Sequence, residues 1–238
     1  MTEPRSEQVV VLAGGLGTRL GPMGADRPKV LQDVLGRPFL DVMLEPVAAS
    51  GLRRFHFCLG HLAPRVAAHL ATLPAEWETT AETEPAPLGT AGALLHSVGH
   101  LDEQFMVLLG DTYLDTDYGG LFDRFPPDSL GMMLLTRASN DVLPNVGVRD
   151  GTVTAYDKNG VPGGLTDTGV TLLRRSALDV LQRARERTDL HELFHALMGR
   201  GALAAAVTGE RFFDIGTPRR HQALATHLSA GTAKEAGI

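Results

Sequence analysis

The chain carries the stretch VVVLAGGLGTRLGPMGADRPKVL at residues 9–31. A short apolar run breaks into glycines, which is typical of a buried strand followed by a phosphate-binding loop. Glycines let backbone N–H groups turn toward an anion without a Cβ in the way. Arg19 adds a forked donor suited to phosphate, and Lys29 adds a compact second charge. We therefore expect an anion site at the end of the first strand.

Two common phosphate-binding motifs do not match this loop. The dinucleotide fingerprint G-x-G-x-x-G needs a third glycine where Leu20 stands. The second apolar strand ends in CLGH, without the acidic residue that would hold a ribose. A Walker loop needs a Gly-Lys pair, and the chain contains none. The loop therefore belongs to another class of phosphate site.

Short apolar runs alternate with longer amphipathic segments in the first part of the chain. This order predicts an α/β fold with a mostly parallel sheet covered on both faces. Such sheets bind ligands at the carboxyl ends of their strands, where the glycine loop lies. The predicted strands are residues 9–13, 55–59, 105–109 and 132–136, and the predicted helices are 39–50, 64–73 and 90–100.

The pattern changes after about residue 140. An Asp-Gly pair at 150–151 between alternating residues predicts a hairpin. Thr217 as N-cap, with Pro218 at the first helical position, predicts the start of a last helix. We also expect strands over 169–173 and 202–207 and helices over 176–186 and 190–199. Without repeats or linkers, the sequence predicts one domain, residues 8–229, with tails at 1–7 and 230–238.

Composition narrows the class of protein. The 238 residues are 43% hydrophobic and 21% charged, as in ordinary globular domains. The net charge of -6 argues against a nucleic-acid partner. The single cysteine, Cys58, excludes an intrachain disulfide and fits a reducing compartment. The polar start and the short apolar runs indicate neither a signal peptide nor a membrane span, so we expect a cytoplasmic protein with no membrane partner.

The opening stretch resembles the L-x-G-G-x-G-T-R-L…P-K signature of the sugar-1-phosphate nucleotidyltransferases. Four later segments follow in the order of that family: EPAPLGTAGAL (84–94), FMVLLGDTYLD (105–115), AYDKNG (155–160) and RFFDIGTPRRH (211–221). The resemblance spans residues 9–221 and implies a Rossmann-like three-layer α/β sandwich. The sheet would be mixed and mostly parallel, and the length implies no C-terminal β-helix.

The resemblance also implies roles for individual residues. The nucleotide-binding residues would be Leu12, Gly14, Gly15, Gly17, Thr18, Arg19, Glu84, Gly89 and Thr90. The catalytic residues would be Arg19, Lys29, Asp111 and Asp214. The sugar-phosphate-binding residues would be Gly147, Asp157, Lys158 and Asp167.

The implied reaction joins two anions, a nucleoside triphosphate and a sugar 1-phosphate, so charge repulsion is the first obstacle. Mg²⁺ held by Asp111 and Asp214 together with substrate phosphates is the usual remedy. The sugar phosphate is already a good nucleophile, so no general base is required. Catalysis would depend on positioning and charge stabilisation. The chain would thus be an enzyme that binds Mg²⁺ and releases an NDP-sugar and pyrophosphate.

The identity of the base and the sugar is less constrained. Glu84 accepts hydrogen bonds only, and guanine offers the adjacent donors N1–H and N2–H₂, which favours GTP. Uridylyl, thymidylyl and adenylyl transfer remain alternatives. The segments LDVMLEPVAASG, EPAPLGTAGALLHSV and GDTYLDTD are most similar to the heptose-1-phosphate guanylyltransferase type. However, Asp167 stands where that type has an asparagine, so heptose and hexose 1-phosphates both stay open, as does a homodimer.

Two other functions compete with this hypothesis. HELFH, residues 191–195, matches the H-E-x-x-H zinc-hydrolase motif, with Glu192 as the base. Asp189 as N-cap with Glu192 at the third helical position forms a capping box, which explains the same residues without a metal. A catalytically silent nucleotide-sugar sensor is the non-enzyme alternative. Retention of Arg19, Lys29, Asp111 and Asp214 argues against it.

Overall fold

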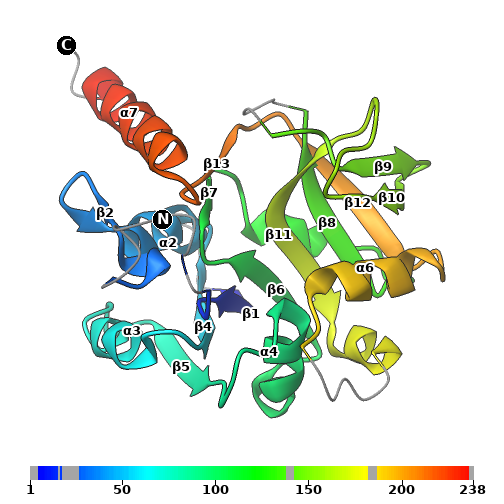
Figure 1. Cartoon of the computed structure of the whole chain (residues 1–238), viewed down its shortest axis with the longest axis horizontal. Helices are drawn as coiled ribbons and strands as arrows, with labels where there is room; N and C mark the ends of the chain where they lie inside the picture. The colour runs from blue at the N-terminus through cyan, green and yellow to red at the C-terminus, as the bar shows by residue number, and fades with distance from the viewer. Residues whose placement is uncertain (1–4, 16, 18–26, 138–141, 182–186, 236–238) are drawn as a thin grey trace.

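The computed structural model describes residues 5–15, 17, 27–137, 142–181 and 187–235. In this part of the chain a nine-stranded sheet runs in the order β5-β4-β1-β6-β11-β8-β12-β10-β9 (Figure 1). Its strands are β1 (Arg5–Leu12), β4 (Leu52–Leu59), β5 (Glu78–Thr83), β6 (Gln104–Leu109), β8 (Gly131–Thr136), β9 (Val146–Arg149), β10 (Thr152–Tyr156), β11 (Thr166–Arg174) and β12 (Leu203–Thr208). Among these nine, β10 and β11 run against the others.

Strand β1 lies inside the parallel half of the sheet. It pairs with both β4 and β6, so that Val9 lies opposite Phe55 on one side and Met106 on the other. The part of a strand that has neighbours on both sides and layers on both faces is usually a run of apolar residues. Val9, Val10 and Val11 are accordingly all buried. The carboxyl ends of β1, β4 and β6 therefore meet at one edge of the sheet.

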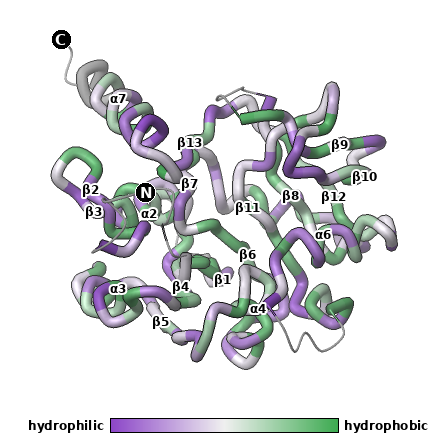
Figure 2. The backbone as a smooth tube through the Cα atoms, viewed as in Figure 1, coloured by the Kyte–Doolittle hydropathy of each residue, from purple (hydrophilic) through white to green (hydrophobic). Residues whose placement is uncertain are grey.

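Hydrophobic layers cover both faces of the sheet. Val9 and Val11 pack into a core that includes α2 (Phe39–Ala49) and α3 (Ala63–Leu70). Val10 points the other way, into a core that includes α4 (Thr90–His96) and α6 (Leu190–Met198). Figure 2 shows hydrophobic residues along the central strands between these helices. The predicted three-layer α/β arrangement with a mixed, mostly parallel sheet is confirmed.

Shorter elements complete the fold. The strands β7 (Thr112–Leu114) and β13 (Phe212–Asp214) form a separate antiparallel pair, as do β2 (Asp33–Val34) and β3 (Arg37–Pro38). The remaining helices are η2 (Lys29–Leu31), η3 (Val98–His100), α5 (Gly119–Asp123), η4 (Arg175–Val180) and α7 (Pro218–Glu235). No helix within the described residues combines the length and the apolar character needed to cross a membrane.

Most predicted elements are confirmed, with two corrections. One helix is predicted over 90–100, but the α-helix ends at His96 and a separate 3-10 turn, η3, follows it. The helix predicted over 176–186 is also wrong in its described part, where Arg175–Val180 is a 3-10 helix. Residues 182–186 lie outside the described residues. Strand β1 begins at Arg5 and α7 ends at Glu235, so both elements extend into the segments expected as tails.

Candidate active site

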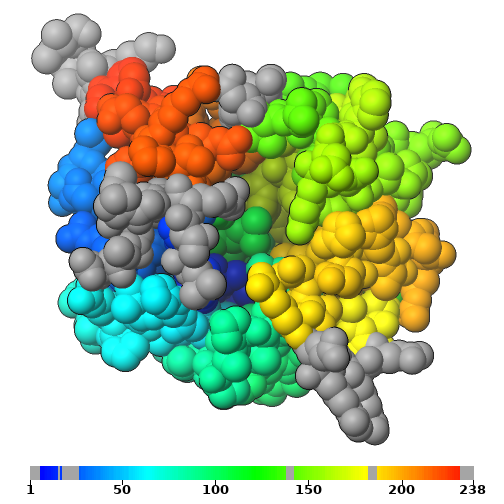
Figure 3. Space-filling view, viewed as in Figure 1, coloured from blue at the N-terminus to red at the C-terminus, as the bar shows by residue number. Residues whose placement is uncertain are grey.

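A cavity of about 420 Å³ opens where β1, β4 and β6 end. Figure 3 shows the hollow near the centre of this face. Its lining comes from segments that are far apart in the sequence: residues 12–15 and 17, 29–30, 58–59, several residues between 84 and 93, 109–111, 187, 189 and 216. The sequence places a ligand site at this edge, and the cavity lies there.

Glycines form the part of the wall that follows β1. Gly17 has a φ of 64°, a left-handed conformation that glycine adopts without strain. A Cβ on Gly14 would lie 3.2 Å from Glu84 Oε1, and one on Gly110 would lie 2.6 Å from the Leu12 carbonyl oxygen. The backbones of three segments therefore approach closely because side chains are absent. Thr18 and Arg19 lie outside the described residues.

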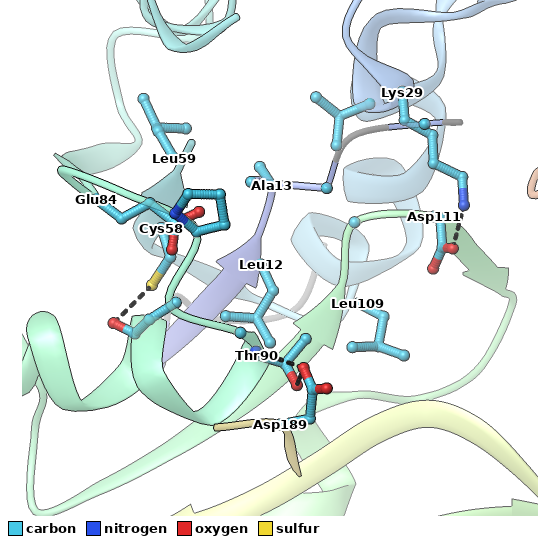
Figure 4. Close-up of a pocket in the computed structure, with 18 of the residues that line it drawn as sticks. Leu12, Ala13, Lys29, Cys58, Leu59, Glu84, Thr90, Leu109, Asp111 and Asp189 are labelled. Atoms are coloured by element: carbon cyan, nitrogen blue, oxygen red, sulfur yellow. Dashed lines mark hydrogen bonds and ion pairs between the residues drawn. The ribbon is translucent and has the colours of Figure 1, made fainter. Parts of the chain in front are cut away.

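Lys29 and Asp111 form an ion pair at one end of the cavity (Figure 4). The short helix η2 carries Lys29, and Asp111 follows the end of β6. Their side chains are 12% and 25% exposed, so both charges are partly shielded from water. This ion pair can be replaced when ligands bind. The ammonium group of Lys29 can then pair with a phosphate, and the carboxylate of Asp111 can bind a cation.

Asp214 approaches Asp111 through the β7–β13 pair. The backbone N–H of Ile215 donates to the carbonyl oxygen of Asp111 at 2.9 Å. The Asp214 carboxylate itself accepts from Gly216 N at 2.9 Å and from Arg220 Nη1 at 3.0 Å. Gly216, rather than Asp214, appears in the cavity wall. The two carboxylates thus come from paired segments, and each already has a cationic neighbour.

The donor set of Asp111 and Asp214 fits Mg²⁺ in one specific way. Mg²⁺ prefers oxygen ligands and is commonly held by one or two carboxylates, substrate phosphates and water. Among the described residues, no three His, Cys, Asp or Glu side chains converge to hold a metal by themselves. Phosphate oxygens and water would therefore have to complete the coordination sphere.

Glu84 lies at the other end of the cavity from Lys29 and Asp111 (Figure 4). Its Oε2 accepts from the backbone N–H of Leu88 at 2.9 Å, which closes the turn 84–88. A Cβ on Gly60 would lie only 2.5 Å from its Oε1. Glu84 is therefore at the cavity as predicted, and one of its oxygens already stabilises the turn.

Gly89 and Thr90 meet residues 188–190, a segment that we call the strap. The amides of Ala91 and Gly92 both donate to the Thr188 carbonyl at 2.9 Å. Thr90 donates its amide to Asp189 Oδ1 at 3.2 Å, and its hydroxyl accepts from Leu190 N at 2.7 Å. Both polar groups of Thr90 therefore have protein partners. No sequence pattern predicted this contact.

Cys58 also lines the cavity, on the side of Glu84 (Figure 4). Burial raises the pKa of its thiol to about 11, while a hydrogen bond with Ser97 acts in the opposite direction. The thiol is therefore protonated at neutral pH and behaves as part of the apolar wall.

The residues expected to bind the sugar phosphate gather outside this cavity. Asn145 joins them, since its backbone oxygen accepts from Asp157 N and its Oδ1 accepts from Asp167 N, both at 2.9 Å. Lys158 lies beside Asp157 and is exposed, and Gly147 lies in β9. The structure brings the sequence-predicted residues into one neighbourhood. It adds Asn145, which the sequence did not single out because an isolated asparagine before a strand is typical of a turn.

Asp167 has an unusual environment within this group. Its Oδ1 accepts from Gly169 N at 2.9 Å, and its Oδ2 accepts from the Tyr156 hydroxyl at 3.2 Å. Burial is the largest influence and raises the pKa of Asp167, although both hydrogen bonds act to lower it. Burial, together with the nearby Asp167, also raises the pKa of Tyr156. The carboxyl group can therefore stay protonated at a pH at which an ordinary aspartic acid is already ionised.

The HELFH segment has the capping role predicted for it. Asp189 and Glu192 form a reciprocal capping box at the start of α6. His191 Nε2 and His195 Nε2 lie 3.0 Å apart on the exposed side. In the described part of the chain, no third ligand of the His, Cys, Asp or Glu type joins them in a metal site. The geometry therefore favours a helix start over a zinc centre.

Comparisons with known proteins agree with this architecture. Residues 8–144 match the family model described as nucleotidyl transferase. A putative mannose-1-phosphate guanyltransferase of Sulfolobus acidocaldarius is 26% identical over 92% of this chain and 62% of its own length. The D-glycero-alpha-D-manno-heptose 1-phosphate guanylyltransferase of Campylobacter jejuni is 24% identical over 89% of this chain and 95% of its own. The chain thus spans less than two thirds of the first relative.

A solved structure also resembles most of this chain. HddC from Yersinia pseudotuberculosis superposes with a TM-score of 0.80 at 25% identity, covering 93% of this chain and 99% of its own. A second structure of HddC, complexed with GMP-PN, gives a TM-score of 0.79 with the same identity and coverage. The likeness extends over both halves of the sheet.

Proposed function

The chain belongs to the nucleotidyl transferase family, and from that membership we propose that it joins a nucleoside triphosphate to a sugar 1-phosphate. A phosphate oxygen of the sugar 1-phosphate forms a bond to the α-phosphorus. The bond from the α-phosphorus to the oxygen that bridges to the β-phosphate breaks, and its electron pair leaves with pyrophosphate. The products are an NDP-sugar and pyrophosphate.

The observation that carries this proposal is the Lys29–Asp111 ion pair beside the glycine wall of the cavity. The triphosphate would lie along Gly14, Gly15 and Gly17, with its charge offset by Lys29 and Arg19. Because the nucleophile is already an anion, these groups serve to hold the two phosphates in line and to stabilise charge. No residue is needed to remove a proton.

We propose Mg²⁺ as the cofactor, held by Asp111 and Asp214 and by phosphate oxygens. When bound, Mg²⁺ offsets the repulsion between the two anionic substrates and draws electron density from the α-phosphate. Arg220 donates to Asp214 and Lys29 donates to Asp111, so this chain orients each carboxylate.

GTP is the nucleotide that we propose, with a heptose or hexose 1-phosphate as acceptor. Support comes from the guanylyltransferase names of the Sulfolobus and Campylobacter relatives and from the GMP-PN complex of HddC. The sugar phosphate would meet Lys158 and Asp157, with Gly147 and Asp167 beside the sugar. Nucleoside triphosphates are cytoplasmic metabolites, which supports the cytoplasm as the place of the reaction.

A pyrophosphate-release screen tests this proposal. Four nucleoside triphosphates are each combined with a panel of sugar 1-phosphates in the presence of Mg²⁺. We expect release that requires both substrates and is fastest with GTP. Asp111→Asn should lower the rate by at least about 100-fold, because it removes a charge that acts in the transition state, with an unchanged circular dichroism spectrum. Full activity of Asp111→Asn would contradict its role, and no release with any pair would contradict the proposed reaction.

A further inference from the structure

We infer that Arg187 contacts the base of the nucleotide and makes the cavity selective for guanine, an inference that rests on the proposed function. Arg187 lines the cavity, is exposed, and lies in none of the motifs that carry the family resemblance.

The strap holds Arg187 in place through its next residue. The backbone N–H of Thr188 donates to the Leu88 carbonyl at 2.8 Å, and the Thr188 carbonyl accepts from Ala91 and Gly92. A Cβ on Gly89 would lie 2.5 Å from that carbonyl oxygen, so the two segments touch through backbone atoms. Arg187 is therefore fixed beside the turn that Glu84 closes, although it is about 100 positions away in the sequence.

This turn lies at the end of the cavity away from the phosphate-binding charges. Figure 4 shows Glu84 and Cys58 on one side of the cavity and Lys29 with Asp111 on the other. The cavity wall also includes the apolar side chains of Leu12 and Ala93 and the thiol of Cys58. Apolar side chains suit the face of a base, whereas the triphosphate requires the cationic end.

Arg187 and Glu84 offer complementary groups at this end. A guanidinium presents two parallel N–H donors, which match the O6 and N7 acceptors of guanine. A carboxylate accepts hydrogen bonds only, with room for several donors, and so suits guanine N1–H and N2–H₂. Adenine places a donor beside N7, and pyrimidines lack the second acceptor. Among the common bases, guanine alone presents acceptors to the arginine and donors to the carboxylate.

Equilibrium binding tests this inference without requiring turnover. Isothermal titration in Mg²⁺ measures Kd for GTP and for 7-deaza-GTP, which lacks the N7 acceptor. We expect the wild type to bind 7-deaza-GTP about 10-fold more weakly than GTP. In Arg187→Met that ratio should fall to about 1, and GTP itself should bind about 10- to 100-fold more weakly. Arg187→Lys should show an intermediate loss, because a point charge replaces the forked donor.

Arg124→Met is the matched control, since Arg124 is an exposed arginine that does not line the cavity. It should bind both nucleotides like the wild type. A wild-type ratio of 1, a ratio that persists in Arg187→Met, or equal weakening for ATP, UTP and GTP would each overturn the inference. Pyrophosphate release with UTP or ATP but no binding of GTP would overturn guanine selectivity alone. Selective GTP binding without pyrophosphate release would overturn the proposed reaction alone.

Discussion

Asp167 is the residue whose charge the fold disfavours most clearly. Burial raises its pKa, so the folded protein holds this proton more tightly than the unfolded chain does. Stability therefore falls as pH rises from the ordinary carboxyl pKa of about 4 through the raised value. Asp167→Asn removes the ionisation and can still accept from Gly169 N. We predict that this variant melts at a higher temperature than the wild type at pH 8, with the difference shrinking toward pH 4.

Thermal melting between pH 4 and pH 8 measures the effect. Asp128→Asn, at an exposed aspartate, is the control and should shift the melting temperature little. A constant difference between Asp167→Asn and the wild type at every pH would contradict the assignment of the effect to ionisation.

Gly60 tests the close approach of the two loops around Glu84. A Cβ at this position would lie 2.5 Å from Glu84 Oε1 and 3.0 Å from both Cα and the carbonyl oxygen of Gly14. Backbone atoms cannot yield as a flexible side chain does. We predict that Gly60→Ala lowers the free energy of unfolding by about 1–3 kcal/mol and weakens nucleotide binding.

Gly99 is the matched position, because a Cβ there meets nothing within 4 Å. Gly99→Ala should change stability by less than about 0.5 kcal/mol. Denaturant unfolding and nucleotide titration of both variants provide the comparison. Equal effects at the two positions would show that the close packing at Gly60 does not contribute to the free energy of unfolding.

At the scale of elements, variants at the start of helix α6 distinguish the capping role of HELFH from a metal-binding role. Glu192 Oε2 accepts from Asp189 N at 2.9 Å, which satisfies an otherwise unpaired helix-start donor. We predict that Glu192→Ala costs about 1 kcal/mol of stability while pyrophosphate release stays near that of the wild type. Glu192→Gln keeps the capping oxygen and should retain most of that stability.

Thermal melting, pyrophosphate release and zinc content of the purified variants provide the readouts. Loss of activity in Glu192→Gln, together with stoichiometric zinc in the wild type, would contradict the capping role. The two variants separate a structural effect from a chemical one, because they differ in whether the hydrogen-bond acceptor is kept.

Sequence patterns predicted the elements that are buried and missed those that are polar or short. The runs at 9–13 and 105–109 are apolar throughout because both sheet faces are covered, and each is found as a strand. Strand β5 has the sequence ETTAET and lies at the sheet edge, so little burial marks it. β7 and β13 have three residues each, too few to show a period. Their pairing is what joins the Asp111 and Asp214 segments.

At the scale of the whole molecule, the cavity is assembled from segments distant in the chain. The rule that parallel strands present ligands at their carboxyl ends sufficed to predict that the segments after β1 and β6 meet. Arg187 and Asp189 could not be placed this way, because they precede a helix in the antiparallel half of the fold. Backbone hydrogen bonds of the strap bring these residues to the Glu84 end of the cavity. Such bonds do not depend on which side chains are present, so the sequence pattern does not reveal them.

The separation between the cavity and the Asn145 neighbourhood predicts that the two substrates respond to different variants. Lys158 lies outside the cavity wall and is exposed. We predict that Lys158→Ala raises the KM for the sugar 1-phosphate by about 10-fold, the weight of one lost charge-assisted hydrogen bond, and leaves the KM for the nucleotide unchanged. Steady-state pyrophosphate release with each substrate varied in turn measures both constants. A change confined to the KM for the nucleotide would contradict the proposal that Lys158 binds the sugar 1-phosphate.

³¹P NMR of one reaction mixture observes directly which bonds to phosphorus form and break. The mixture holds Mg²⁺, the protein, and the triphosphate and sugar 1-phosphate that react fastest together. We predict equal growth of an NDP-sugar and of pyrophosphate at the expense of both substrates, and growth at least about 100-fold slower when Asp111→Asn replaces the wild type. Release of inorganic phosphate without a new sugar diphosphate, or unchanged spectra for every substrate pair, would contradict the account.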